Sequence, residues 1–120
     1  MKQVLVIDEA PLFRDYLQAK LGENNIDVDM AVNSQDGLAK LRNIAPDLLV
    51  LDYNLKNQGC MEMLKQKKAS SALAPIPVII TARQIDQKKI LEMVPYNVKK
   101  VFTKPVKIDT FLETTQEILN

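Results

Sequence analysis

Five short apolar runs recur along the chain, and each has the length and composition of a β-strand. Residues 4–7 and 48–51 are unbroken runs of leucine and β-branched residues, a pattern typical of strands buried on both faces. Residues 26–32 instead alternate apolar side chains with Asp27 and Asp29, which predicts an edge strand with one solvated face. The five predicted strands span residues 4–7, 26–32, 48–51, 78–81 and 101–103.

Apolar residues at helical spacing follow each of these runs. Pro11 suits the first turn of a helix, and Gly22 is expected to end that helix. Ser34 is expected to cap a second helix that runs to Asn43, and Pro46 to end the connection after it. The residues that define the five helices are Leu12, Phe13, Tyr16, Leu17 and Leu21; Leu38 and Leu41; Met61 and Leu64; Ile85, Lys88, Lys89 and Met93; and Ile108, Phe111, Leu112, Thr115 and Leu119.

This alternation of five strands with five helices predicts the fold class. A strand followed by a helix and a further strand favours a parallel sheet with right-handed crossovers, so we expect an α/β, doubly wound fold with helices on both faces. A length of 120 residues suits one domain, and no linker or repeat divides the chain. We therefore expect a single domain over residues 1–120.

Composition and charge narrow the classes of partner. No apolar run approaches the roughly 18 residues of a membrane helix, and the start of the chain does not resemble a secretory signal. We expect a cytoplasmic protein without a membrane partner. The net charge is +1, and neither residues 65–68 nor residues 99–100 form a basic face with aromatics, so no direct nucleic-acid binding is expected. The lysines of these two clusters are interpreted as solvated charge.

The residue types present also restrict the chemistry. The chain has no histidine and one cysteine, Cys60, which excludes histidine-dependent hydrolases, cysteine-rich zinc sites and intrachain disulfides. Catalysis would have to use carboxylates, hydroxyls, lysine or a metal ion. Cys60 itself has no cysteine neighbour and is interpreted as an unreactive thiol.

Polar residues follow four of the five predicted strands. Asp8 and Glu9 follow the first, Asp52 follows the third, Thr81 ends the fourth, and Lys104 comes just after the fifth. Ligands of open α/β sheets bind at the carboxyl ends of the strands, so these side chains should meet at one edge. Three crowded carboxylates suit a hard cation such as Mg²⁺. Asp52 could then attack phosphorus, while a hydroxyl and an ammonium bind the transferred phosphoryl oxygens.

Four segments of the chain resemble the receiver domains of bacterial two-component response regulators, the CheY-like superfamily. The segments are residues 4–12, 46–52, 78–82 and 102–105, and the resemblance covers essentially the whole chain. It implies a flavodoxin-like sheet of strand order 2-1-3-4-5 and a cis peptide bond at Lys104-Pro105. The site that it implies has Asp52 as phosphoacceptor, Asp8 and Glu9 as acidic metal ligands, Asn54 as a metal ligand through its backbone carbonyl, and Thr81 and Lys104 as the pair that senses the phosphoryl group.

The same resemblance implies a function in a phosphorelay. A sensor histidine kinase or phosphotransfer protein would phosphorylate Asp52 in a reaction that requires Mg²⁺ or Mn²⁺. The change would reach an unknown downstream protein through the face formed by the fourth helix, the fifth strand and the fifth helix. The chain would be a signalling switch that gains and loses its own phosphoryl group, not a turnover enzyme, and would be a monomer or weak homodimer.

Three positions depart from the family pattern. Lys56 stands where proline is usual, and Cys60 stands where glycine is usual, with Gly59 one position earlier. Val101 replaces an aromatic residue that commonly reports phosphorylation by turning inward. Phe102 follows it and, by the alternation of a strand, should point to the opposite face.

Other classes of function fit fewer of these residues. An aspartate-nucleophile phosphatase would have a second aspartate two residues after the nucleophile, where this chain has Asn54. A pseudo-receiver that acts only in docking, or as a phosphate sink, would not need the whole acidic, hydroxyl and lysine set. A flavin or nucleotide binder is weaker still, because none of the 3 glycines forms a phosphate-binding loop.

Overall fold

The computed structural model describes residues 1–120 and contains one sheet of five parallel strands. The strand order is β2-β1-β3-β4-β5, so the predicted α/β class and the order 2-1-3-4-5 are confirmed. The peptide bond Lys104-Pro105 is cis, as expected. The strands are β1 (Gln3–Ile7), β2 (Asp27–Ala31), β3 (Leu48–Asp52), β4 (Val78–Ala82) and β5 (Val98–Thr103).

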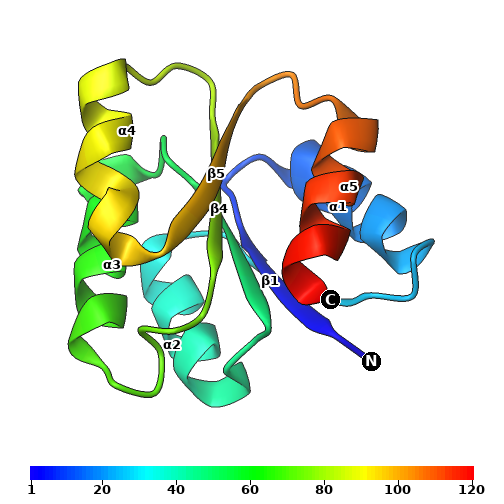
Figure 1. The fold of residues 1–120 in the computed structure, drawn as a ribbon, viewed down its shortest axis with the longest axis horizontal. Coiled ribbons are helices and arrows are strands. Elements are labelled where there is room, and N and C mark those ends of the chain that lie inside the picture. Colours follow the sequence, from blue (N-terminus) through cyan, green and yellow to red (C-terminus); the bar gives the residue numbers. More distant parts are fainter.

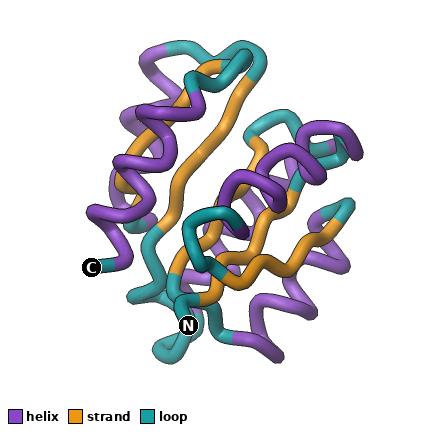
Figure 2. The backbone as a smooth tube through the Cα atoms, turned by 90° about the vertical axis from the view of Figure 1, so that its right-hand side faces the viewer, coloured by secondary structure: helices purple, strands orange, loops and turns teal.

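Helices cover both faces of this sheet (Figure 1). Helices α1 and α5 lie on one face, and α2, α3 and α4 lie on the other (Figure 1). Figure 2 shows α1 and α5 from outside, in front of the strands. No helix is both long and apolar enough to cross a membrane. The helices are α1 (Pro11–Gly22), α2 (Ser34–Ile44), α3 (Gly59–Ala69), α4 (Gln87–Met93) and α5 (Ile108–Leu119), with short 3₁₀ turns at Lys56–Gln58 and Val94–Tyr96.

The alternation of side chains along each strand produces two hydrophobic cores. Val4 and Val6 of β1 pack with α1 and α5, while Leu5 and Ile7 pack with α2, α3 and α4. All residues of β3 and β4 are buried, as expected for central strands covered on both sides. The ends of these strands are therefore held rigidly, which fixes the side chains that follow them.

The first helix differs from its prediction at two points. Gly22 is the last helical residue and not the terminator; the chain turns at Asn25, which has a φ of 62°. Leu12 and Tyr16 are exposed, with Leu12 at 83%, because they lie about 100° or more around the helix from the buried Leu17 and Leu21. Only part of the apolar surface of α1 therefore faces the core.

The boundaries of three other elements also differ from their predictions. Asn33, not Ser34, caps α2: its side-chain oxygen accepts a hydrogen bond from the Asp36 N–H at 2.8 Å. Asp86 caps α4 in the same way, so Ile85 precedes that helix. Strand β5 begins at Val98, three residues before its predicted start, because exposed lysines are tolerated on an edge strand.

The structure contradicts the interpretation of Lys67 as a solvated charge. Its side chain is 1% exposed, and its ammonium donates a hydrogen bond to the carbonyl of Ala74 at 2.9 Å. Burial lowers the pKa of this lysine to about 8. The neighbouring Lys65 and Lys68 are exposed, as predicted.

Candidate functional site

A cleft of about 310 Å³ opens where the strands of the sheet end. It brings together five of the six predicted site residues, from the ends of β1, β3 and β5. The sixth, Thr81, is buried in β4 directly beside Asp52, its register partner in β3. The lining residues are Asp8, Glu9, Ala10, Asp52, Asn54, Lys56, Arg83 and Lys104.

Lys104 connects the two buried aspartates of the cleft. Its ammonium lies 2.8 Å from Asp8 Oδ2 and 4.0 Å from Asp52 Oδ1. Asp8 is 1% exposed and Asp52 is 5% exposed, so both carboxylates have lost most of their water. One ammonium thus neutralises part of two desolvated negative charges.

The surroundings of Asp52 oppose its ionisation. Burial raises the pKa of this carboxyl above its usual value, and the negative charge of Asp8 raises it further. The Asn54 N–H, which donates to Asp52 Oδ1 at 3.0 Å, lowers the pKa in part, as do the charges of Lys104 and Arg83. Asp52 Oδ2 has no hydrogen-bond partner, so one carboxylate oxygen is free for chemistry or for a cation.

Glu9 and Asn54 are both held by neighbouring loops. Glu9 Oε1 accepts a hydrogen bond from the Lys56 N–H at 2.8 Å. The side-chain oxygen of Asn54 accepts one from the Arg83 N–H at 2.8 Å, which ties the loop after β3 to the loop after β4. The Asn54 side chain is therefore occupied, and its backbone carbonyl is the group left for a metal.

Thr81 has a buried hydroxyl without a hydrogen-bond partner. Its backbone is satisfied, since its carbonyl accepts from the Tyr53 N–H at 2.8 Å. A buried polar group without a partner costs about 1–3 kcal/mol, so such groups are rare in folded proteins. This unpaired hydroxyl next to Asp52 is suited to an additional oxygen ligand.

Sequence reasoning missed three residues that support the site. The Phe13 ring lies 4.3 Å from the Lys104 ammonium, and Arg14 donates to the carbonyl of Asp8 at 2.7 Å. Both are on α1 and give no sequence signal, because their contacts with Lys104 and Asp8 depend on where α1 lies in the folded chain. Arg83 could have been found, since it follows Thr81 by two residues at a strand exit.

The oxygen atoms of this cleft fit a hard divalent cation. Asp8 and Asp52 are two desolvated carboxylates without enough counter-charge, and Mg²⁺ typically binds few carboxylates together with carbonyls and water. No three histidine, cysteine or acidic side chains gather closely enough to form a metal site by themselves. Water, the Asn54 carbonyl or a Glu9 side chain that turns inward from the rim would therefore have to complete the coordination.

Cys60 lies near this site but has the properties of an unreactive residue. It is buried, and burial together with the negative charge of Asp52 raises the pKa of its thiol to about 12. Since the thiolate is the reactive form, the interpretation of Cys60 as inert agrees with its surroundings.

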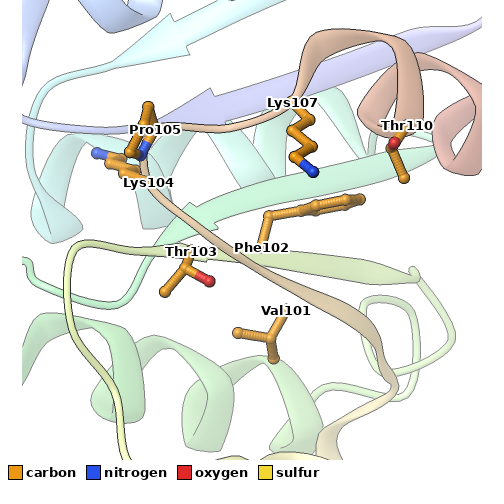
Figure 3. A pocket seen from close by; sticks show the side chains of 7 residues that line it. All are labelled: Val101, Phe102, Thr103, Lys104, Pro105, Lys107 and Thr110. Atoms are coloured by element: carbon orange, nitrogen blue, oxygen red, sulfur yellow. The ribbon is translucent and has the colours of Figure 1, made fainter.

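A second hollow, of about 380 Å³, runs along β5 to the start of α5 (Figure 3). Val101 and Phe102 point to opposite sides of β5, as predicted (Figure 3). Val101 is half-buried against the α3 and α4 core, whereas Phe102 packs on Phe111 with ring centroids 5.5 Å apart. Lys104 is the one residue that lines both this hollow and the cleft.

The amino-acid sequence of this chain is similar to those of several known proteins. The family model for the response regulator receiver domain matches residues 4–116. The protein PilH of Pseudomonas aeruginosa is 26% identical over 119 residues, which cover 99% of this chain and 98% of PilH. The response regulator ArlR of Staphylococcus aureus is 28% identical over 99% of this chain, which spans only 53% of ArlR.

The solved structures agree on the fold. The chemotaxis response regulator CheY4 of Vibrio cholerae superposes with a TM-score of 0.89 and 23% identity over 99% of both chains. A response regulator receiver protein from Pseudomonas putida superposes with a TM-score of 0.90 and 20% identity. At this level of identity the likeness extends to the fold.

Proposed function

The chain belongs to the response regulator receiver domain family, and from this premise we propose that Asp52 accepts a phosphoryl group from a sensor histidine kinase or a phosphotransfer protein. Receiver domains are switches of two-component signalling and not typical turnover enzymes. In our proposal residues 1–120 act as one such domain. Phosphorylation would change the affinity of the α4, β5 and α5 face for a downstream protein.

The observation that carries this proposal is the unpaired hydroxyl of Thr81 beside Asp52. A phosphoryl group on Asp52 would add oxygen acceptors next to this donor. The hydroxyl would then recover the hydrogen bond that it lacks, and its desolvation cost would be offset only in the phosphorylated form. A hydroxyl that has a hydrogen-bond partner only in the phosphorylated form favours the conformation of that form, which is the bias that a two-state switch requires.

Asp52 would act as the nucleophile. Its Oδ2 has no hydrogen-bond partner, while Oδ1 is held by the Asn54 N–H at 3.0 Å, so the carboxylate is oriented with one oxygen free. That oxygen forms a bond to phosphorus, and the bond between phosphorus and the leaving atom of the donor breaks. Lys104 lies 4.0 Å from Asp52 Oδ1, where its ammonium can bind a phosphoryl oxygen.

Receiver domains use Mg²⁺ for phosphorylation, and the cleft has groups to hold it or Mn²⁺. Asp8 and Asp52 would supply carboxylate oxygens, Asn54 its backbone carbonyl, and Glu9 a further carboxylate from the rim. The cation would neutralise charge that develops on the transferred phosphoryl oxygens. Lys104 is now paired with Asp8. If Asp8 held a cation, this ion pair would weaken, and the Lys104 ammonium would be available to a phosphoryl oxygen.

A phosphorylation assay tests the proposal. A small phosphodonor with Mg²⁺ should add one acid-labile phosphoryl group, seen by mass spectrometry, and Asp52→Asn should abolish the addition. Asp109→Asn is the matched control, because Asp109 is an exposed aspartate outside the cleft and should label like the parent. Equal labelling of Asp52→Asn and parent would refute the assignment.

A further inference from the structure

Residue 56 holds the carboxylate of Glu9 through both of its nitrogen groups. The Lys56 N–H donates to Glu9 Oε1 at 2.8 Å, and the Lys56 ammonium lies 3.9 Å from Glu9 Oε2. The two residues are 47 positions apart in the sequence, so this contact ties the loop after β1 to the loop after β3. Both residues also line the cleft that contains Asp8 and Asp52.

The two contacts differ in strength. The Lys56 side chain is 85% exposed, and exposed ion pairs typically contribute little to stability. The N–H belongs to the backbone, is fixed at no cost in side-chain entropy, and donates to a charged acceptor, which strengthens the bond. The backbone N–H of residue 56 is therefore the main restraint on Glu9.

The local backbone does not itself require this N–H. Leu55 has φ −63° and ψ 144°, the conformation that a residue before proline adopts, and residue 56 opens a 3₁₀ turn. Leu55 therefore already has the conformation that a proline at position 56 would require, and the first N–H of the turn has no partner within the turn. Its hydrogen bond to Glu9 is thus an added contact that links two loops.

We propose that Lys56 is a positioning residue that competes with the metal ion for Glu9. The inference rests on the metal site proposed above. With Glu9 held at the rim by Lys56, Asp8 and Asp52 are the carboxylates directly available to a cation. Glu9 can join them only by releasing the Lys56 N–H, so metal binding and the attachment of the 56–58 turn oppose each other. The metal affinity of this chain is lower than it would be with Glu9 free.

Two variants of the same residue separate the N–H from the charge. Lys56→Pro removes both, whereas Lys56→Ala removes the ammonium and keeps the N–H. Titration calorimetry should show that Lys56→Pro binds Mg²⁺ roughly threefold to tenfold more tightly than the parent, as expected for loss of one competing charged hydrogen bond. Lys56→Ala should differ from the parent by less than about twofold, since its charge is exposed and screened.

Repeating the titrations in a Glu9→Gln background shows whether the tighter Mg²⁺ binding of Lys56→Pro depends on the Glu9 carboxylate. In a double-mutant cycle, Lys56→Pro should change Mg²⁺ affinity by less than about twofold once Glu9 is Gln. A second readout uses the parent alone: the Lys56 amide proton should shift upfield during Mg²⁺ titration as it loses its acceptor. This readout does not depend on the folding of a proline variant.

Each outcome has one meaning. Equal Mg²⁺ affinities of Lys56→Pro and Lys56→Ala, an unchanged gain in Glu9→Gln, or a Lys56 amide that does not move would each overturn the competition while leaving the metal site intact. Failure of the parent itself to bind Mg²⁺ would instead refute the metal site, and the competition with it. Loss of binding in Asp8→Asn identifies the site in which the titrations are measured.

Discussion

The burial of Lys67 should make the stability of the protein depend on pH, by an amount that its surroundings allow us to calculate. Its side chain is 1% exposed on α3, with the Ala74 carbonyl 2.9 Å away as its hydrogen-bond acceptor. Burial lowers its pKa from 10.5 to about 8 in the folded chain. Because the folded state holds this proton less tightly than the unfolded state, the penalty for burying the charge is largest below pH 8.

The sign and size of the pH dependence follow from linkage. Between the folded and unfolded pKa values the unfolded chain binds the proton and the folded chain does not, so stability rises with pH. The shift corresponds to a penalty of about 3 kcal/mol near neutral pH, which falls to about 1 kcal/mol near pH 9.5. Relative to Lys67→Met, the parent should therefore gain about 2 kcal/mol in free energy of unfolding between pH 7 and pH 9.5.

Urea unfolding followed by circular dichroism at both pH values measures this difference. Comparison with Lys67→Met cancels the other titrating groups, and the chain has no histidine to titrate in the same range. Lys65→Met is the control, because Lys65 is exposed on the same helix and should show no such change. A difference between Lys67→Met and parent that is constant with pH would refute the burial of a charged lysine.

Three further predictions concern the cleft and the core. Mg²⁺ should raise the melting temperature of the parent, with about 2–3 kcal/mol of stabilisation at a hundredfold excess over Kd, and calorimetry should find a weaker response in Asp8→Asn. A beryllofluoride mimic of the phosphoryl group should change the amide chemical shifts of α4 in the parent and in Val101→Ala, but not in Thr81→Ala. Val101→Ala should also lose about 1 kcal/mol of packing stability. A mimic that changes no shift at α4 or β5 in the parent would favour a docking or phosphate-sink role. Gly37→Ala should cost about 1–2 kcal/mol in urea unfolding, since its new Cβ would lie 2.5 Å from a core side chain, whereas Gly22→Ala faces open space and should not destabilise.

The fold could be predicted from the sequence because its strands differ sharply from their surroundings. Residues 48–51 and 78–81 are apolar runs bounded by polar residues, and the structure places strands there. The errors arose where local signals were ambiguous: Asn33 and Ser34 are both good capping residues, and only the geometry of the turn selects one. Lys67 was misjudged because its burial depends on the connection from α3 to β4.

The site was predictable to the extent that it lies at strand ends. Five of its predicted residues line one cleft because parallel strands bring their carboxyl ends to the same edge. The hydrogen bond from Lys56 to Glu9 and the packing of Phe13 under Lys104 could not be predicted, since both depend on loop and helix positions that no periodicity encodes. Which oxygen atoms remain free is likewise a property of the folded chain.

The pair of Lys104 and Asp8 also has a consequence for folding. These residues are 96 positions apart, yet their side chains meet at 2.8 Å. Closing so long a segment costs chain entropy, which only the contacts of all the intervening strands and helices can repay. A partly synthesised chain that ends before β5 lacks Lys104, so the carboxylates of Asp8 and Asp52 would face each other without this ammonium. In the proposed function, phosphorylation of Asp52 would therefore require that β5 and Lys104 have already been synthesised.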